Sequence, residues 1–276
     1  MGEGDARSLV RRIPQYTRLL PARLRLDILS LGLEALEPLV ELLQDESLAE
    51  PGAPGRGYAP VHAAELLVAL RSPEVITPLV RRLMRTRPGD MLYDALLFVL
   101  EELGPAVAPA ALEALGEART PDQRLGLLSV LSHSGARSER ILSVLLEFLQ
   151  EEPGQGALAL ARYGDARALE PLTRALDACP LDEEMVDLFA NQSIIELESA
   201  IVKLGGTLDE AQREKVARAR RSRKWLGGML RQMLETLPPL PPLPEDGEPL
   251  HLAPDDPCWC GSGLRYEQCH QGDDSR

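Results

Sequence analysis

Aromatic residues are scarce in this sequence: phenylalanine, tryptophan and tyrosine together make up 4% of its 276 residues. Hydrophobic residues of all kinds nevertheless reach 44%, because leucine and alanine are abundant. Leucine, alanine, glutamate and arginine favour helices over sheets, and no run of alternating β-branched residues indicates a strand. A chain of this length can bury a sizeable core in one or two domains. We therefore predict an all-α fold.

The chain also lacks an excess of positive charge, since 30 lysines and arginines face 43 aspartates and glutamates and the formal net charge is −13. This balance argues against general affinity for DNA or anionic membranes. No apolar run approaches the roughly 20 residues that span a bilayer. The first residues, Met1 to Asp5, are acidic and do not have the form of a signal peptide. We expect a cytoplasmic protein.

Cysteine is rare as well, and it is unevenly distributed. Three of the four cysteines and one of the four histidines fall within residues 256–270, in the order Cys-x-Cys, eight residues, Cys-His. A disulfide framework would spread its cysteines, whereas thiolates with a neutral imidazole suit a tetrahedral structural Zn²⁺. Gly261 and Gly263 allow a tight turn after the first pair. The pattern predicts a zinc knuckle, with a reduced, metal-free tail as the alternative.

The segment from Pro254 to Gly272 resembles the SEC-C motif, the short zinc-binding tail of the translocase motor SecA that recurs on unrelated bacterial proteins. Pro-Cys-x-Cys-Gly-Ser-Gly-x-x-Tyr-x-x-Cys-His carries the resemblance. The motif implies contact with an acidic chaperone or the ribosome. Lysines usually surround the tyrosine, but here only Arg265 is basic, which argues against an acidic partner. By this resemblance, one structural Zn²⁺ is held by Cys258, Cys260, Cys269 and His270.

A repeat runs through the first two thirds of the chain. Leucine-rich runs begin at Pro38, Pro78, Pro109, Arg140 and Pro171, and from Pro78 onward three successive spacings are 31 residues. Each run from Pro78 onward is preceded by another apolar run of helical length, and glycines close three of these preceding runs. The preceding runs are 63–70, 96–103, 125–131 and 156–163. We predict an α-solenoid of antiparallel helix pairs.

This pattern resembles the HEAT-like family, particularly its short bilin-lyase-type repeats, over about residues 22–178. The resemblance implies a curved stack of helix pairs whose concave face binds a partner, and it does not by itself imply lyase chemistry. The first interval contains a Gly/Pro-rich insertion, Glu50 to Pro60, that we expect to be non-helical. With Arg56 and Tyr58, it is either a recognition loop or a tolerated surface insertion.

Beyond Pro180 the repeat fades. Residues 182–204 predict a longer acidic helix that caps the array, and Thr207 with Glu210 predicts a capping box for a helix over 208–237. The first half of that helix is basic on all sides, so we expect it to protrude into water, either as an RNA- or ribosome-facing handle or as a solvated face. Its basic residues are Arg213, Lys215, Arg218, Arg220, Arg221, Arg223 and Lys224.

Prolines then follow at high density from Leu237 to Pro249, as in polyproline II. Such a segment makes a semi-rigid tether for the knuckle. We thus predict four parts: a HEAT-like helical repeat domain (1–204), a basic and amphipathic helix (205–237), a Pro-rich linker (238–253) and the SEC-C zinc-binding motif (254–272).

No P-loop, nucleophile elbow or dinucleotide fingerprint is present. His62 and Glu65 lie one helical turn apart, as in half of a metal site, but no second such pair exists. We therefore expect a non-enzymatic interaction scaffold or adaptor, whose knuckle adds a second contact through effective concentration. One alternative is an RNA- or ribosome-associated factor that uses residues 213–224 and the knuckle, with steep salt dependence. Another is a bilin-lyase-like HEAT enzyme.

Overall fold

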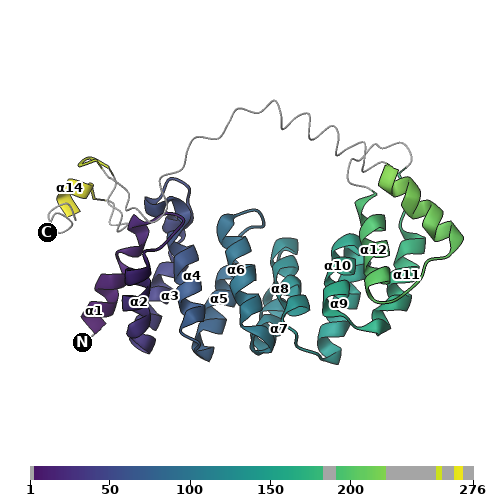
Figure 1. The fold of residues 1–276 in the computed structure, drawn as a ribbon, viewed down its shortest axis with the longest axis horizontal. Helices are drawn as coiled ribbons and strands as arrows, with labels where there is room; N and C mark the ends of the chain where they lie inside the picture. The colour runs from purple at the N-terminus through teal and green to yellow at the C-terminus, as the bar shows by residue number, and fades with distance from the viewer. Residues whose placement is uncertain (1–2, 183–190, 222–252, 257–263, 270–276) are drawn as a thin grey trace. The chain divides into compact units, whose positions relative to one another are not determined.

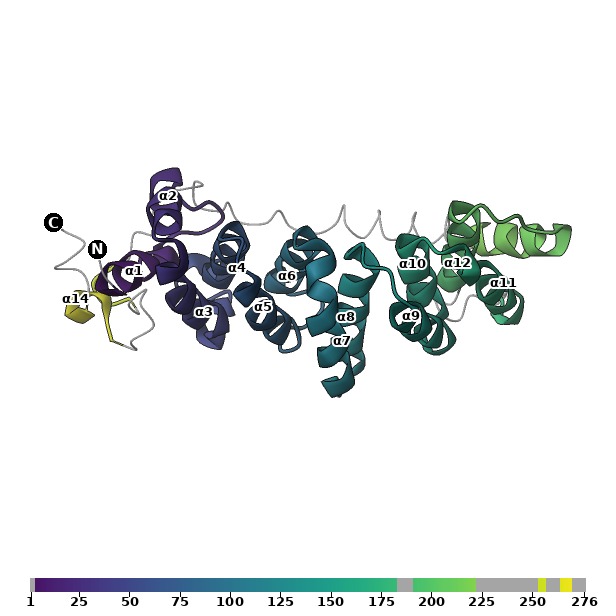
Figure 2. The same ribbon diagram turned by 90° about the horizontal axis from the view of Figure 1, so that it is seen from below.

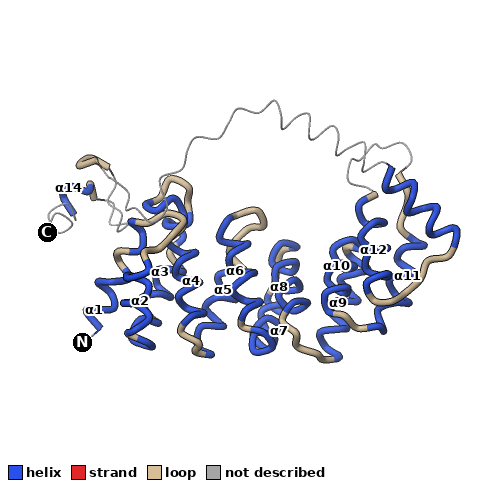
Figure 3. The backbone as a smooth tube through the Cα atoms, in the orientation of Figure 1, coloured by secondary structure: helices blue, strands red, loops and turns tan. Residues whose placement is uncertain are grey.

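The computed structural model describes residues 3–182, 191–221, 253–256 and 264–269. The chain divides into two compact units, Met1–Val130 with Pro242–Arg276 and Leu131–Pro241, and each is described by itself (Figure 1). The described residues are helices, turns and loops, without a β-strand (Figure 3). The all-α prediction is confirmed.

Helix pairs build the first unit. Figure 2 shows α2, α4 and α6 along one side of the unit and α3, α5 and α7 along the other, so that the two rows enclose the core between them. The helices are α1 (Glu3–Val10), α2 (Ala22–Ser30), α3 (Leu36–Gln44), α4 (Ala59–Ala69), α5 (Ile76–Leu83), α6 (Met91–Glu102) and α7 (Ala108–Glu117). Helix α8 (Pro121–His133) contains the boundary between the units.

The second unit continues the pairing. Helix α10 packs against both α9 and α12, and α11 packs against α12. A further helical stretch over residues 210–221 follows α12. The bounds are α9 (Glu139–Glu151), α10 (Pro153–Tyr163), α11 (Leu169–Ala178) and α12 (Gln192–Lys203). The expectation that a helix closes the array after the last repeat matches the position of α12 against α10 and α11.

The predicted repeat positions are confirmed. Pro38, Pro78, Pro109 and Pro171 each lie in the first turn of the second helix of a pair, where a missing N–H costs nothing. Gly104, Gly135 and Gly164 have φ angles of 62°, 73° and 78°. This left-handed conformation is the one that ends helices, and glycine adopts it without steric cost.

Leucine and alanine fill the core, as the composition indicates. Leu66 and Leu67 of α4 and Leu96 and Leu100 of α6 have no exposed surface. Within the described residues, no single helix is long and apolar enough to cross a membrane. Helix α6 together with Gly104–Glu117 reaches the required length and composition as a pair bent by 116°. Both members of that pair contribute buried side chains to the core of the first unit.

Gly156 marks the closest approach of α9 and α10. A Cβ atom at this position would lie 2.4 Å from the Cα of Leu149. We expect Gly156→Ala to lower the free energy of unfolding by about 1–3 kcal/mol, because the two backbones would have to separate. Gly116 in α7 has open space around it, so Gly116→Ala should instead stabilise by about 0.5–1 kcal/mol. Urea unfolding measures both, and equal effects would contradict the close packing.

The insertion between α3 and α4 differs from the prediction. It contains a 3-10 turn over Pro54–Gly57, and α4 begins at Ala59. Gly55 and Gly57 are buried with φ angles of 69° and 84°, and a Cβ on Gly55 would lie 2.7 Å from the Tyr16 carbonyl oxygen. Glycine lets the segment fold back against the 3-10 turn Ile13–Gln15. It is therefore a packed element of the first unit, from which Arg56 remains exposed.

The described residues contain the predicted helix over 182–204 from Gln192 onward, and they interrupt it at Asn191. Helix α12 begins at Gln192, and residues 183–190 lie outside the described residues. Asp182 is not helical: its backbone N–H donates to the Asn191 side-chain oxygen at 2.9 Å, and its carbonyl accepts from the Asn191 amide at 2.9 Å. The Asn191 side chain thereby makes the two hydrogen bonds that the backbone of Asp182 would otherwise make within a helix. The predicted domain boundaries at 204 and 237 stay predictions.

Candidate metal centre and neighbouring sites

The described part of the cysteine-rich segment is a clip that brings its two ends together. The backbone N–H of Tyr266 donates to the Asp256 carbonyl at 2.8 Å, and that of Glu267 donates to the Pro254 carbonyl at 2.9 Å. Asp256 also closes a turn on itself: its carboxylate accepts from the Ala253 N–H at 2.7 Å. The residues just before Cys258 thus lie beside the short helix α14 (Tyr266–Cys269).

This clip positions one predicted ligand. Cys269 is the last residue of α14 and is half-buried, while Cys258, Cys260 and His270 lie outside the described residues. Asp256 is two residues before Cys258, and Tyr266 is three residues before Cys269, so the hydrogen bond between them joins the arms that carry the first and third cysteines. Three thiols and one imidazole are a donor set that fits a closed, four-coordinate zinc site. In the described part of the chain, His, Cys, Asp and Glu form no group of three that could hold a metal.

The basic helix begins differently from the prediction. The capping box is formed by Asp209 and Gln212: the Asp209 carboxylate accepts from the Gln212 N–H at 2.8 Å, and the Gln212 side-chain oxygen accepts from the Asp209 N–H at 3.1 Å. The predicted pair, Thr207 and Glu210, lies two residues too early. The helix starts at residue 210, and its buried residues Gln212, Val216 and Ala219 share one face.

Over residues 210–221 the basic helix packs one face on the second unit, which differs from the predicted protrusion into water, and residues 222–237 of the predicted helix lie outside the described residues. Lys215 is half-buried, whereas Arg213, Arg218, Arg220 and Arg221 are exposed. The Lys215 ammonium donates to the carbonyls of Leu176 and Asp177, at 2.7 and 3.0 Å, and so caps the C-terminus of α11. Arg220 pairs with Glu198 of α12 at 2.8 Å, and Arg218 pairs with Glu214 at 2.9 Å. Several of the predicted nucleic-acid contacts are therefore occupied within the second unit.

His62 is buried and lies beside the exposed Glu65, and its second ring nitrogen is already engaged by the backbone. His62 is 3% exposed, and its Nε2 lies 2.5 Å from the Thr17 carbonyl oxygen. Its Nδ1 lies 3.9 Å from the Glu65 carboxylate, which also lies 3.7 Å from Arg25. The neighbouring His62 ring, and after it the charge of Arg25, hold the pKa of Glu65 below its ordinary value. The sequence indicated the pair by its spacing, but not that Thr17 uses the second ring nitrogen.

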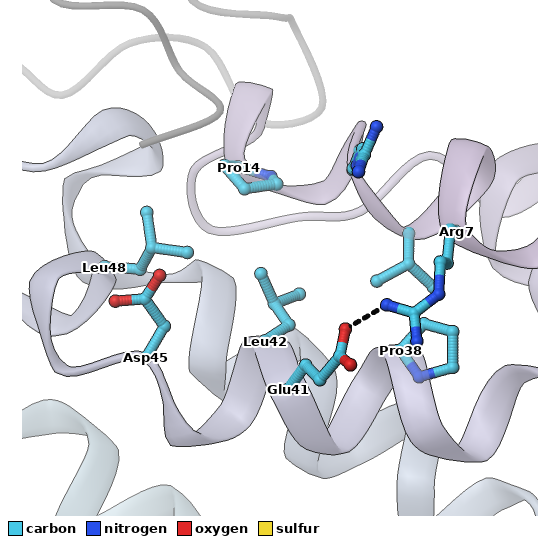
Figure 4. Close-up of a pocket in the computed structure, with 9 residues that line it drawn as sticks. Arg7, Pro14, Pro38, Glu41, Leu42, Asp45 and Leu48 are labelled. Atoms are coloured by element: carbon cyan, nitrogen blue, oxygen red, sulfur yellow. Dashed lines mark hydrogen bonds and ion pairs between the residues drawn. The ribbon is translucent and has the colours of Figure 1, made fainter. Parts of the chain in front are cut away.

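A small hollow of about 200 Å³ lies between α1 and α3 (Figure 4). Arg7 reaches across its rim to the carboxylates of Glu41 and Glu37, and Asp45 accepts a hydrogen bond from the Ser47 N–H at 3.0 Å. The remaining lining is mostly apolar, and Leu42 and Leu48 face the hollow. Arg7 and Glu41 are thus engaged with each other, and the lining residues do not form a nucleophile with an adjacent base.

Comparison with known families gives matches in two regions of the chain, the cysteine-rich segment and the helical array. Residues 256–272 match the family model of the SEC-C motif, and residues 154–178 match that of the PBS lyase HEAT-like repeat. The second match covers α10 and α11, including Gly156 and Pro171. Neither a curated protein nor a solved structure is significantly similar to the chain. The chain therefore combines a HEAT-like helical repeat with a C-terminal SEC-C motif.

Proposed function

We propose that this protein is a non-enzymatic interaction scaffold, in which the HEAT-like array holds a protein partner and the SEC-C motif makes a second contact. Helical repeat arrays present extended surfaces. Their apolar side chains pack each repeat against its neighbours and do not assemble a reaction centre. The SEC-C motif, tethered by the Pro-rich segment, would add a second weak contact and so raise the overall affinity through effective concentration. The observation that supports this proposal most directly is the joining of a repeat array to a compact clip that carries Cys269.

The proposed cofactor is one structural Zn²⁺, bound by Cys258, Cys260, Cys269 and His270. Four protein ligands close the coordination sphere and leave no position for a water molecule to be activated. The clip between Asp256 and Tyr266 supports this assignment because it holds together the two arms of the motif that carry the first and third cysteines. We propose a cytoplasmic location, where thiols stay reduced and free to bind metal.

The RNA- or ribosome-associated alternative has less support. Lys215, Arg218 and Arg220 are engaged within the second unit, so a nucleic acid would have to displace these contacts or rely on the remaining cations. The bilin-lyase-like alternative needs a catalytic group. At the hollow in Figure 4, Arg7 is paired with Glu37 and Glu41, so these charged groups do not supply one.

Capture of the partner by the full-length tagged protein, with chemical crosslinking at low and high salt, tests the proposal. We expect Cys258→Ser to reduce retention of the partner at least tenfold, because the second contact is lost. Cys179→Ser is the matched control, since Cys179 lies outside the motif and should leave retention unchanged. Changing Arg218, Arg221 and Arg223 to glutamate should also leave it unchanged. Retention that disappears with ribonuclease, high salt or this triple change would favour the RNA-associated alternative.

A further inference from the structure

Helix α6 exposes an aromatic side chain, unlike the rest of the described chain. Phe98 is 62% exposed, whereas every other phenylalanine or tyrosine among the described residues is buried or half-buried. Met91 lies seven residues earlier, on the same face of α6, and is 39% exposed. Burying a phenylalanine stabilises a protein by about 1.5–3 kcal/mol, so an exposed one next to a second exposed apolar side chain on the same face indicates a contact surface.

Carboxylates flank this apolar pair on the same face of the helix. Asp94 lies four residues before Phe98, and Glu102 lies four residues after it. Both are exposed, and neither forms an ion pair with a residue that the structure describes. The face from Met91 to Glu102 extends for about 17 Å, at 1.5 Å per residue, which equals three helical turns.

A second hollow continues from the end of this face. It has a volume of about 710 Å³ and lies within the first unit, where Glu102 and Leu103 of α6 meet Val68 and Ala69 of α4. Arg25 and Arg71 also line it, and Arg25 is already paired with Glu65 at 3.7 Å. The side formed by α6 is therefore acidic, with apolar surface next to it.

We propose that the face of α6 formed by Met91, Asp94, Phe98 and Glu102 binds a basic amphipathic helix of a partner protein. Apolar side chains of that helix cover Phe98 and Met91, and one of them enters the hollow beside Leu103. Its lysines or arginines lie against Asp94 and Glu102, neither of which forms an ion pair with a described residue. An aromatic anchor surrounded by complementary charge is the usual composition of a binding hot spot. This inference names the contact surface of the proposed scaffold and rests on that function.

The test uses the full-length protein and a fluorescent 18-residue peptide in which leucines form one face of a helix and lysines the other. Fluorescence anisotropy at physiological ionic strength gives the Kd. We expect Phe98→Ala to weaken binding about tenfold or more, and the pair Asp94→Lys with Glu102→Lys to weaken it at least as much. A scrambled peptide of the same composition and a leucine–glutamate peptide should both bind at least tenfold more weakly.

Two matched variants separate this surface from general attraction to an acidic protein. Leu26 is also exposed, at 66%, so Leu26→Ala controls for loss of an apolar side chain. Glu113 and Glu117 are exposed on α7, so changing both to lysine controls for the same change in net charge. Both variants should bind within about twofold of the wild type.

The proposal is wrong if Phe98→Ala binds like the wild type, or if either control weakens binding as much as the α6 variants do. It is also wrong if Phe98 contacts lipid and not the peptide. In that case Phe98→Ala would abolish attachment to neutral phosphatidylcholine vesicles while peptide binding persists. Capture of the crosslinked partner by Phe98→Ala, with peptide binding lost, would leave the scaffold function standing and assign the partner to another surface. Failure of the wild type to capture any partner would instead contradict the scaffold function.

Discussion

Chelation of zinc from the full-length protein is expected to unfold the SEC-C motif and to leave the melting of the helical array unchanged. Structural zinc contributes on the order of 10–16 kcal/mol in small zinc-binding peptides, far more than a segment of this size gains by burial. The array has its own leucine and alanine core, which does not depend on the motif. The motif should therefore be folded with metal and unfolded without it.

Two signals follow this change separately. Trp259 lies between the first two predicted ligands, so its fluorescence should change on chelation, and Trp225→Phe removes the background of the other tryptophan. Circular dichroism at increasing temperature follows the array, whose midpoint should shift by no more than about 2 °C. A large drop in that midpoint would mean that the metal supports the array, in contradiction to this account.

Tyr163→Ala is expected to cause the largest loss of stability among substitutions in the array, about 3–5 kcal/mol. Tyr163 is 1% exposed, and its ring lies 4.6 Å from the guanidinium carbon of Arg137. Its hydroxyl donates to the Ser138 carbonyl and accepts from the Ser138 N–H, both at 3.1 Å. Removing the side chain leaves a cavity and releases the segment that leads into α9.

Tyr163→Phe separates these two contributions. It keeps the ring but removes the two hydrogen bonds, so we expect a loss of about 1–2 kcal/mol. Phe98→Ala is the control for an exposed aromatic side chain and should change stability by no more than about 0.5 kcal/mol. Urea unfolding measures all three variants. If Tyr163→Ala and Phe98→Ala had equal effects, Tyr163 would not have the structural role that its contacts indicate.

The repeat was predictable from the sequence because its signals are local and occur several times. Pro109 and Pro171 begin helices where proline is tolerated, and Gly104 and Gly164 end them in a conformation that favours glycine. The cysteine-rich segment was predictable for a similar reason, since the spacing of ligand residues is itself the pattern. The family matches over 154–178 and 256–272 agree with both predictions.

The predictions that were wrong depended on contacts between distant residues. Two capping boxes, Thr207 with Glu210 and Asp209 with Gln212, fit the same stretch of sequence. The second forms because Gln212 also donates to the Asp177 carboxylate of α11 at 2.7 Å. Likewise, nothing near Lys215 in the sequence indicates that it caps a helix about 40 residues earlier. A periodicity argument shows which face is apolar, but not which neighbour covers it.

The insertion after α3 shows the same limit. Glycine and proline correctly indicated that the chain turns there, but not that Gly55 and Gly57 pack closely against the Tyr16 and Ala49 carbonyls. Only the position of the N-terminal turn relative to α4 determines that contact. The turn at Asp256 could have been suspected, since an aspartate suits a tight turn and its carboxylate accepts from the Ala253 N–H at 2.7 Å. The backbone hydrogen bond from Tyr266 to the Asp256 carbonyl has no such local signal.

The central claim is that the C-terminal motif is a zinc centre, and metal content per chain tests it most directly. Native mass spectrometry of the full-length protein, purified with zinc available and without chelator, should give the mass of the chain with one zinc ion. Cys179→Ser should retain that zinc, whereas Cys258→Ser and Cys269→Ser should each lose it or bind it at least tenfold more weakly. A wild-type protein without metal, or a Cys258→Ser variant with one zinc per chain and unchanged affinity, would contradict the account.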